Sequence, residues 1–145
     1  MTLVIGAGEK HHKDATHIDI RESAKPDIVH DLNERPWPID SESVHYVIAE
    51  DIIEHLDDVV SIVEEIHRIL EPNGKVYITT AHYMHENSWH DPTHKWHLSE
   101  QSFDYFDPDT AWGKKYGYYS DKKFHITHKT VAGGNVVIEM EKRNG

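Results

Sequence analysis

Histidine side chains are concentrated in one segment of this chain. The sequence contains 14 histidines in 145 residues, and five of them lie between residues 81 and 97, together with two tryptophans. Imidazole can hydrogen-bond a loop together, act as a general base or ligate a metal ion. The residues of this segment that could take part are His82, His85, Glu86, Trp89, His90, Asp91, His94, Trp96 and His97.

These three uses of imidazole predict different sites, and the sequence leaves all of them open. In a structural interpretation, the histidines hold an irregular loop together. In a catalytic one, the segment forms an acceptor pocket in which His82 or His94 is the base and the tryptophans supply stacking surface. In a metal interpretation, the least favoured because the spacing matches no known zinc signature, the ligands are His90, Asp91, His94 and His97.

A helix beginning in this segment would bring two of the histidines together. Asp91 is a suitable N-cap residue, and Pro92 is a suitable first helical residue. His94 and His97 would then lie three residues apart on the same helix face.

A glycine turn and several carboxylates follow apolar segments in the first half of the chain. Gly6-Ala7-Gly8 comes directly after an apolar run, and such a turn lets backbone N–H groups approach a ligand closely. Asp19 ends the next apolar segment, where an acidic side chain can accept hydrogen bonds from both hydroxyls of a ribose. Asp31 could face an adenine amino group or form an Asx turn near Asn33.

Hydrophobic patterning indicates the elements that must position these residues. Apolar residues recur every three or four positions between residues 50 and 70, which predicts a helix there. Strands are predicted over residues 2–5, 16–20, 27–30, 44–49, 75–80, 124–130 and 135–141, and a short helix over residues 99–106. Gly133-Gly134 is a hairpin turn signal between the last two strands.

Strands that alternate with a helical crossover imply an α/β fold with a mostly parallel sheet, to which the final hairpin adds antiparallel strands. Ligands of such sheets bind beyond the carboxyl ends of the strands. The residues that we expect at this edge are Gly6, Ala7, Gly8, Asp19, Asp31, Glu50, Asp51 and His82.

Several stretches, in order and spacing, resemble class I S-adenosylmethionine-dependent methyltransferases, most closely the small type 11 group. They are Leu-Val-Ile-Gly-Ala-Gly at residues 3–8, His-Ile-Asp-Ile at 17–20, Asp-Ile-Val-His-Asp-Leu-Asn at 27–33, Glu-His-Leu at 54–56 and Glu-Ile-His-Arg-Ile-Leu-Glu-Pro-Asn-Gly-Lys at 65–75. The likeness covers residues 2–82 and implies a Rossmann-like three-layer sandwich.

The resemblance also implies roles for individual residues. The implied contacts to S-adenosylmethionine are Gly6, Ala7 and Gly8 for its amino-acid part, Asp19 for the ribose hydroxyls, Ile20, Asp31 and Leu32 for the adenine, and Glu50 and Asp51 for the sulfonium end. Carboxylates suit the positive charge of a sulfonium. The candidate catalytic groups are Asp51, His82 and His94.

The chain departs from this family in the length of its first crossovers. Only residues 9–15 and 21–26 connect the first three strands, whereas a helical crossover needs a dozen residues or more. The first-half helices should therefore be reduced, which leaves one sheet face poorly covered. Because a large apolar face is unstable in water, we expect a second copy of the chain, a partner subunit or a folded-back C-terminal segment to cover it.

Composition narrows the class of protein. We expect one domain over residues 1–145. The 15 basic and 26 acidic residues give a net charge of −11, which argues against duplex nucleic acid as a partner. The absence of cysteine excludes disulfides, cysteine-ligated zinc and a thiol nucleophile. The apolar run at the N-terminus is too short for a signal peptide or a membrane span, so we expect a cytoplasmic protein.

Methyl transfer from S-adenosylmethionine to a small molecule or a protein-borne group is the function that the sequence favours. Two alternatives stay open. The chain could be a cofactor-binding subunit without turnover, or a metal-dependent hydrolase or lyase that uses the histidine-rich segment 82–97.

Overall fold

The computed structural model describes residues 1–6, 8 and 10–144. Ala7, one of the expected cofactor contacts, lies outside the described residues, as do Glu9 and Gly145.

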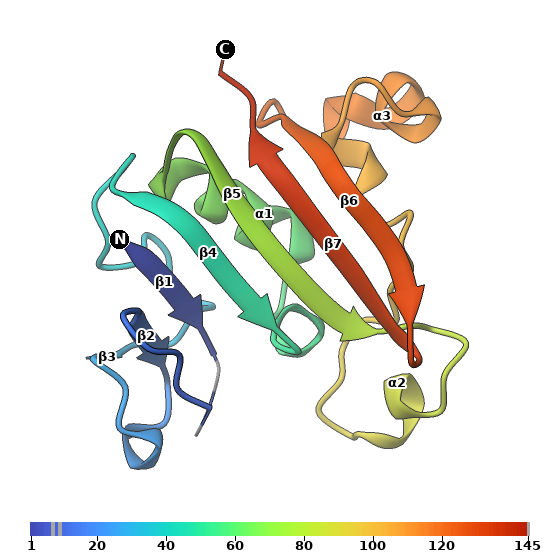
Figure 1. Cartoon of the computed structure of the whole chain (residues 1–145). Helices are drawn as coiled ribbons and strands as arrows, with labels where there is room; N and C mark the ends of the chain where they lie inside the picture. Colours follow the sequence, from blue (N-terminus) through green and yellow to red (C-terminus); the bar gives the residue numbers. More distant parts are fainter. Residues whose placement is uncertain (7, 9, 145) are drawn as a thin grey trace.

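The described residues form a seven-stranded sheet in the order β3-β2-β1-β4-β5-β7-β6 (Figure 1). The strands are β1 Thr2–Ile5, β2 Thr16–Asp19, β3 Ile28–Val29, β4 Val44–Glu50, β5 Leu70–Ala81, β6 Phe124–Ala132 and β7 Asn135–Lys142. The five strands β3-β2-β1-β4-β5 are parallel, whereas β7 runs antiparallel to both β5 and β6. The prediction of a Rossmann-like, mostly parallel sheet with a C-terminal antiparallel hairpin is confirmed.

The helices of the described chain are few and short. They are α1 Val59–Ile69, α2 Asn87–His90 and α3 Ala111–Tyr116, with 3-10 turns η1 Glu22–Ala24, η2 Ile53–His55, η3 Asp104–Phe106 and η4 Gly117–Tyr119. Between β1 and β3 the described residues contain the single turn η1, as the short crossovers predict.

The helix predicted over residues 50–70 is wrong in extent. Asp51 adopts a left-handed backbone conformation with φ 54°, so the chain leaves β4 through a turn. The side chain of Asp58 then accepts a hydrogen bond from the Ser61 N–H at 3.2 Å and caps α1, which begins one residue later. An acidic residue that caps a helix excludes the preceding residues from it.

Two further helix predictions are also wrong. The short helix predicted over residues 99–106 is reduced to η3. No helix begins at Asp91, because its Oδ1 atom accepts the Thr93 N–H at 2.9 Å in an Asx turn. A local side-chain hydrogen bond of this kind competes with helix formation. His94 and His97 therefore do not share a helix face.

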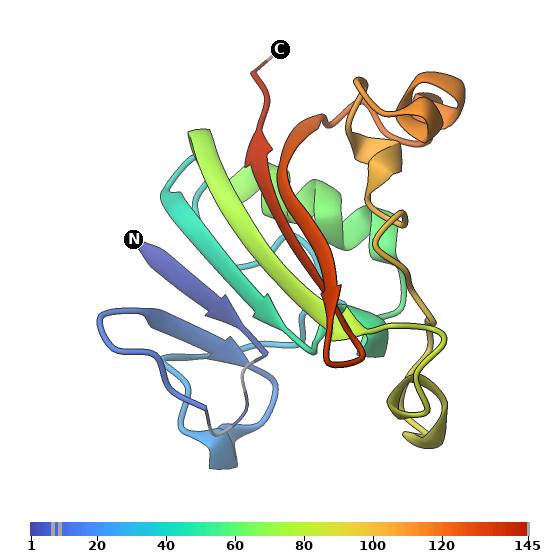
Figure 2. The ribbon, with the colours of Figure 1, turned by 45° about the vertical axis from the view of Figure 1, so that its right-hand side comes forward.

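One face of the sheet carries the core. The apolar side of α1 (Ile62, Val63, Ile66 and Ile69) packs on buried residues of the strands, among them Val47, Val76, Ile78, Ile138 and Met140. Figure 2 shows α1 and the segment between β5 and β6 on the same side of the sheet. These elements form the one helical layer that the described residues supply.

The opposite face of β4, β5 and β7 has no helix among the described residues, and we call it the open face (Figure 1). Side chains alternate between faces along a strand, so the half-buried Tyr46, Ile48, Tyr77 and Val137 lie here. The expectation that a folded-back C-terminal segment covers this face is wrong, since β6 and β7 extend the sheet instead.

The segment that follows the glycine turn covers part of the same face beside β1. Val4 points away from the core side of β1, yet it is 0% exposed. The His12 N–H donates to Nε2 of His17 at 2.9 Å, and the His11 ring lies 4.6 Å from the His17 ring. A packed loop thus takes the place of the absent helix over β1 and β2.

A membrane span is not found in the described part of the chain, where every helix is too short and too polar to cross a bilayer.

Candidate functional site

A cavity of about 190 Å³ lies at the carboxyl ends of β1, β2 and β3. Five of the residues expected around the cofactor line it: Gly6, Asp19, Ile20, Asp31 and Leu32. The other lining residues are Asn33, Ile52, His55 and Leu56, which come from the turns after β3 and β4. We call this the cofactor cavity.

The glycine turn forms one wall of the cofactor cavity. The Gly6 N–H donates to the carbonyl of Ile18 at 2.8 Å, which holds the turn against β2. Gly6 has φ +64°, and a Cβ atom there would lie 2.3 Å from Cγ1 of Ile52. Only glycine fits this position without strain or displacement of its neighbour.

Asp19 is held rigidly at the end of β2. Its Oδ2 atom accepts the Gly8 N–H at 3.0 Å, and its Oδ1 atom accepts the Arg21 N–H at 2.8 Å. The residue is only 7% exposed. An ionised carboxylate has about four lone-pair sites, so each oxygen retains room for a further donor.

Asp31, Ile20 and Leu32 surround the rest of the cavity. Asp31 Oδ1 accepts the Asn33 N–H at 2.9 Å, so the Asx turn that the sequence allowed is present. The other carboxylate oxygen stays available to a ligand. Two apolar side chains also line the cavity: Ile20, which is 60% exposed, and Leu32, which is buried.

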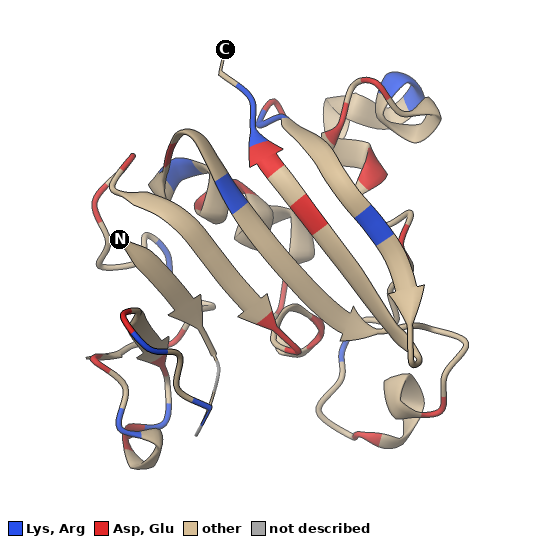
Figure 3. Ribbon diagram, in the orientation of Figure 1, with Lys and Arg blue, Asp and Glu red and all other residues tan. Residues whose placement is uncertain are grey.

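The two acidic residues at the end of β4 have different surroundings. Glu50 accepts a hydrogen bond from Lys10 at 3.0 Å. It also accepts one from His12 at 2.7 Å when the His12 ring carries a proton at Nε2. Burial alone would raise the pKa of Glu50, but these hydrogen bonds outweigh it and the net pKa is lowered. Asp51 accepts one long hydrogen bond, from the Thr79 hydroxyl at 3.5 Å, and desolvation together with the charge of Glu50 outweighs it and raises the pKa of Asp51. Figure 3 shows the acidic residues at the tip of β4 and in the turn that follows.

A second group of polar side chains borders the cofactor cavity. Glu54, His55 and His94 each offer a potential ligand atom, and these atoms lie within 4.8 Å of one another. The His55 and His94 rings meet edge to face, with 4.6 Å between their centroids. Burial raises the pKa of Glu54, and burial together with His94 lowers the pKa of His55.

The structure places His82 away from the residues that line the cofactor cavity. Its Nε2 atom lies 3.1 Å from Oε2 of Glu100, and its Nδ1 atom accepts the Met84 N–H at 3.2 Å. With both ring nitrogens engaged, His82 holds the turn after β5 in place and has no free lone pair for a substrate proton.

Other side chains of the histidine-rich segment make contacts that hold the loop together. The His97 ring stacks on Trp89 at 3.5 Å, and its Nδ1 atom lies 2.8 Å from the Ser88 hydroxyl. Trp96 donates from Nε1 to the carbonyl of Leu56 at 2.9 Å. Of the predicted metal ligands, only His94 belongs to a group of three potential ligands among the described residues, whereas His90, Asp91 and His97 do not.

Sequence reasoning missed Asn33, Ile52 and Leu56 as lining residues. The Glu-His-Leu stretch at residues 54–56, which matches the family, was the available signal for His55 and Leu56. Asn33 and Ile52 had no comparable signal, because both lie in turns whose path depends on tertiary packing.

Comparison with sequence families gives one match, to the family described as Methyltransferase domain, over residues 7–78. This segment runs from the glycine turn to the middle of β5 and includes every described residue that lines the cofactor cavity except Gly6. No curated protein matches the sequence.

Solved structures share the fold at low sequence identity. A chain in the complex between the Haloferax volcanii Trm112 methyltransferase activator and the putative methyltransferase is similar with a TM-score of 0.72 and 14% identity, covering 99% of this chain and 82% of that one. A SAM-dependent methyltransferase from Methanosarcina mazei gives 0.70 and 14%, covering 99% and 92%. The (4+2)-cyclase SpnF gives 0.71 and 11%, covering 99% and 74%.

These likenesses agree with the topology of the sheet and with the position of the cavity. The family match covers β2, β3, β4 and the turns that line the cavity, but not β1, and the structural likeness extends over 99% of the chain. The chain is thus similar to the Methyltransferase domain family over residues 7–78, and it has the fold of solved SAM-dependent methyltransferases.

Proposed function

We propose that this chain binds S-adenosylmethionine in the cofactor cavity and transfers its methyl group to a small molecule or a protein-borne group. The observation that carries this proposal is the convergence of the glycine turn, Asp19 and Asp31 from three neighbouring strands on one cavity. Carboxylates at these strand ends are the groups that recognise a nucleoside in folds of this kind.

The residues of the cofactor cavity fit the adenosine part of the ligand. We assign the ribose hydroxyls to Asp19, whose oxygens each have one backbone donor and one remaining site. We assign the adenine ring to the apolar surface of Ile20 and Leu32, with the free oxygen of Asp31 facing its amino group.

When bound, S-adenosylmethionine supplies an electrophilic methyl group on a positively charged sulfur. The contribution of the protein is to hold the reactants in line and to exclude water. Because Glu50 is occupied by Lys10 and His12, we assign the sulfonium end to Asp51. The raised pKa of Asp51 also suits it to receive a proton from a hydroxyl or amine acceptor.

His82 and His94 are the other catalytic residues that the sequence suggests. We propose a positioning role for His82, because its ring nitrogens are engaged with Glu100 and Met84. His94 is closer to the site, since it contacts the cavity-lining His55.

A partner that covers the open face belongs to the same proposal. The neighbour from Haloferax volcanii is in a complex with Trm112, a methyltransferase activator. The half-buried Tyr46, Ile48, Tyr77 and Val137 give this chain an apolar strip that a partner subunit or a second copy would bury.

A cofactor-binding subunit without turnover is the second candidate function. The open face, which carries no helix among the described residues, favours this second candidate. The likeness to a protein described as a (4+2)-cyclase supports the same caution, since a fold does not determine its reaction.

Calorimetry with S-adenosylhomocysteine tests the binding that both candidates require. We expect saturable 1:1 binding, weakened by more than about tenfold in Asp19→Ala through loss of charge-assisted hydrogen bonds. Asp121→Ala is the matched control, because this carboxylate has an 85% exposed side chain and lies outside the residues that line the cofactor cavity. Asp19→Asn, which keeps the shape of the side chain, serves if the alanine variant melts early.

Two outcomes separate the candidates. Absence of binding at high micromolar ligand would overturn both of them. Binding, together with methyl transfer from labelled S-adenosylmethionine to an acceptor, supports the enzyme, whereas binding without transfer, alone or with a captured partner, supports the subunit.

A further inference from the structure

Two histidines and a glutamate face one another beside the cofactor cavity, although they come from distant parts of the sequence. Glu54 and His55 belong to the 3-10 turn η2, whereas His94 lies in the irregular segment after α2. Their potential ligand atoms lie within 4.8 Å of one another. This is a set of nitrogen and oxygen donors of the kind that binds divalent transition metals.

Hydrogen bonding fixes His94 in a form that presents a bare nitrogen. Its Nδ1 atom lies 3.1 Å from the carbonyl oxygen of Ser88, and because a carbonyl only accepts, Nδ1 must carry the proton. In the neutral ring, Nε2 then has a free lone pair. That atom lies 4.0 Å from Glu54 Oε2 and 3.5 Å from Asp91 Oδ2, beyond hydrogen-bond distance in the first case and at its limit in the second.

His55 is fixed in the same way by Thr93. The Thr93 hydroxyl donates to Asp91 Oδ1 at 2.7 Å, so its oxygen is left to accept from Nδ1 of His55 at 2.8 Å. The neutral ring of His55 therefore also presents an unprotonated Nε2. Metal-binding histidines almost always donate their second N–H to a carbonyl, a carboxylate or a similar outer group, and both histidines follow this pattern.

Glu54 supplies the independent observation that a ligand belongs here. The residue is 2% exposed, and both its Oε1 atom and the neighbouring Thr80 hydroxyl are buried without a hydrogen-bond partner among the described residues. A buried, unsatisfied carboxylate oxygen is costly, so native structures rarely contain one without an unseen water, ion or ligand. Within the described chain, the one basic group close enough to pair with Glu54 is His94.

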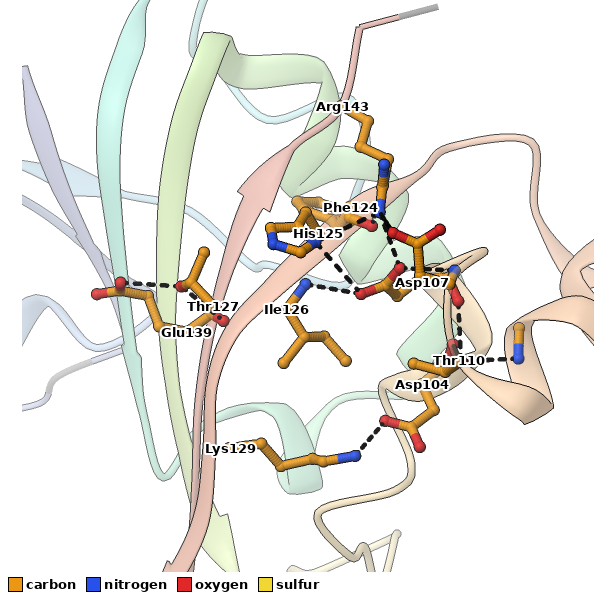
Figure 4. A network of polar contacts seen from close by, with 12 residues as sticks. Asp104, Asp107, Thr110, Phe124, His125, Ile126, Thr127, Lys129, Glu139 and Arg143 are labelled. Atoms are coloured by element: carbon orange, nitrogen blue, oxygen red, sulfur yellow. Dashed lines mark hydrogen bonds and ion pairs between the residues drawn. The ribbon is translucent and has the colours of Figure 1, made fainter.

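A second cluster of potential ligands, with two carboxylates and one histidine, has a different arrangement. Asp107, Asp109 and His125 also lie within 4.8 Å of one another. Here Arg143 inserts its guanidinium, with Nη2 at 3.1 Å from Asp107 and 2.7 Å from Asp109 (Figure 4). The Asp107 carboxylate also accepts hydrogen bonds from the backbone N–H groups of Ile126 and Asp109. An arginine cation already occupies this cluster, so it is structural.

We infer that Glu54, His55 and His94 bind a divalent transition-metal ion of the zinc type, with Asp91 as a further ligand or an outer carboxylate. Two imidazole nitrogens and one carboxylate form the protein ligand set of many catalytic zinc sites. Ligands at about 2.1 Å from such an ion lie about 3.4 Å apart, so small side-chain rotations close the present separations. The absence of cysteine is no obstacle to this donor set.

The place of the site gives the ion a use beyond stability. His55 is both a ligand and a lining residue of the cofactor cavity, so the ion would lie at the edge of that cavity. Three protein ligands leave a coordination position open, and an oxygen atom of a second substrate can fill it. The metal inference itself stands on the contacts above and does not depend on methyl transfer.

Titration of the metal-free chain with Zn²⁺ tests the inference without an activity assay. We expect one high-affinity ion per chain, with a Kd below about 10 µM by calorimetry, and weaker binding of Mg²⁺, which prefers oxygen ligands. Co²⁺ in place of Zn²⁺ should give visible absorption bands that report imidazole and carboxylate ligation.

Variants separate this site from the other histidines. Glu54→Gln and His94→Asn should each weaken Zn²⁺ binding by at least about 100-fold, since loss of an outer group alone costs about 10- to 100-fold. Thr93→Val should fall in that outer-group range. His125→Asn is the matched control, and we expect it to bind Zn²⁺ as the natural chain does.

The Glu54→Gln variant distinguishes loss of a ligand from misfolding, because glutamine is nearly isosteric with glutamate. The melting temperature of this variant, measured beside the titration, shows whether it is folded. Three results would overturn the inference: no Zn²⁺ binding at about 100 µM, equal affinity in the folded Glu54→Gln chain, or a loss in His125→Asn as large as that in His94→Asn. In any of these cases Glu54 and His94 form a buried ion pair only.

Discussion

His12 Nε2 lies 2.7 Å from Oε1 of Glu50, at the carboxyl end of β4. Lys10 binds the other oxygen of the same carboxylate at 3.0 Å. These contacts fasten the segment after the glycine turn across the face of β1, where a longer crossover would place a helix. The polar contacts of Glu50 thus hold a loop where a helix would otherwise pack, and Val4 beneath this loop is fully buried.

Replacement of Glu50 by glutamine should loosen this segment. The change removes both charge-assisted hydrogen bonds, so amide exchange of residues 10–17 should become faster while exchange in β4 and β5 stays slow. The free energy of unfolding should fall by only about 0.5–1 kcal/mol, because Lys10 and His12 are partly exposed.

Hydrogen-exchange mass spectrometry measures this local effect directly. Glu139→Gln is a suitable control, because Glu139 pairs with Lys75 at 3.9 Å on the open face, away from the segment. Equal exchange of residues 10–17 in the natural and Glu50→Gln chains would mean that the loop is held by other contacts.

Alanine at Gly6 should damage both stability and cofactor binding. The backbone has φ +64°, and the new Cβ atom would lie 2.3 Å from Ile52. We expect a loss of about 1–3 kcal/mol in the free energy of unfolding, measured by urea denaturation. In the double variant Gly6→Ala, Ile52→Ala, the clash with the Ile52 side chain is relieved while the backbone strain remains. Its loss of unfolding free energy should therefore not exceed the sum of the losses in the two single variants. A Gly6→Ala chain of unchanged stability and affinity would contradict the close approach.

The strands of this fold could be predicted because each has a local signal in the sequence. The apolar, β-branched runs at residues 2–5, 44–49 and 75–80 are short, and the Gly133-Gly134 turn, with φ +58° and +80°, marks the hairpin. β5 itself begins earlier than predicted, at Leu70, and includes Pro72 and Gly74. The start of α1 is marked in the sequence by the acidic pair Asp57 and Asp58, of which Asp58 is the N-cap, although the apolar periodicity also extends over the preceding residues. The short α2 and α3 depend on tertiary packing and carry no periodic signal.

The candidate site divides in the same way. Gly6, Asp19 and Asp31 follow strands, so their convergence could be predicted from the parallel topology alone. The proximity of Glu54 to His94 could not, because 40 residues and an irregular loop separate them in the sequence. The predicted metal ligands accordingly included His94 and Asp91 but omitted Glu54 and His55.

A charge placed on the open face should change the association of the chain. Tyr77 lies in the centre of this face on β5, opposite Glu139 of β7. If a second copy covers the face, Tyr77→Lys should shift sedimentation toward the monomer with little change in melting temperature of the isolated chain. If the natural chain sediments as a monomer at about 100 µM, the cover is a different subunit, and self-association is excluded at that affinity.

Glu65 should make the stability of this protein depend on pH in the acidic range. Glu65 is a buried residue of α1, and its carboxylate accepts hydrogen bonds from the Trp37 N–H at 2.6 Å and from Arg68 Nε at 2.8 Å. Burial alone would raise the pKa of Glu65, but these hydrogen bonds outweigh it and hold the pKa below its usual value. A lowered pKa in the folded state stabilises the fold above the usual carboxyl pKa, and this contribution is lost as the pH falls through the lowered value.

Glu65→Gln should therefore cost about 1–3 kcal/mol of unfolding free energy at neutral pH. The difference from the natural chain should shrink as the pH falls through the acidic range, because the natural side chain then becomes neutral as well. Urea denaturation at a series of pH values measures both curves. Parallel curves, with the same difference at every pH, would show that the glutamate acts through shape and hydrogen bonding rather than through its charge.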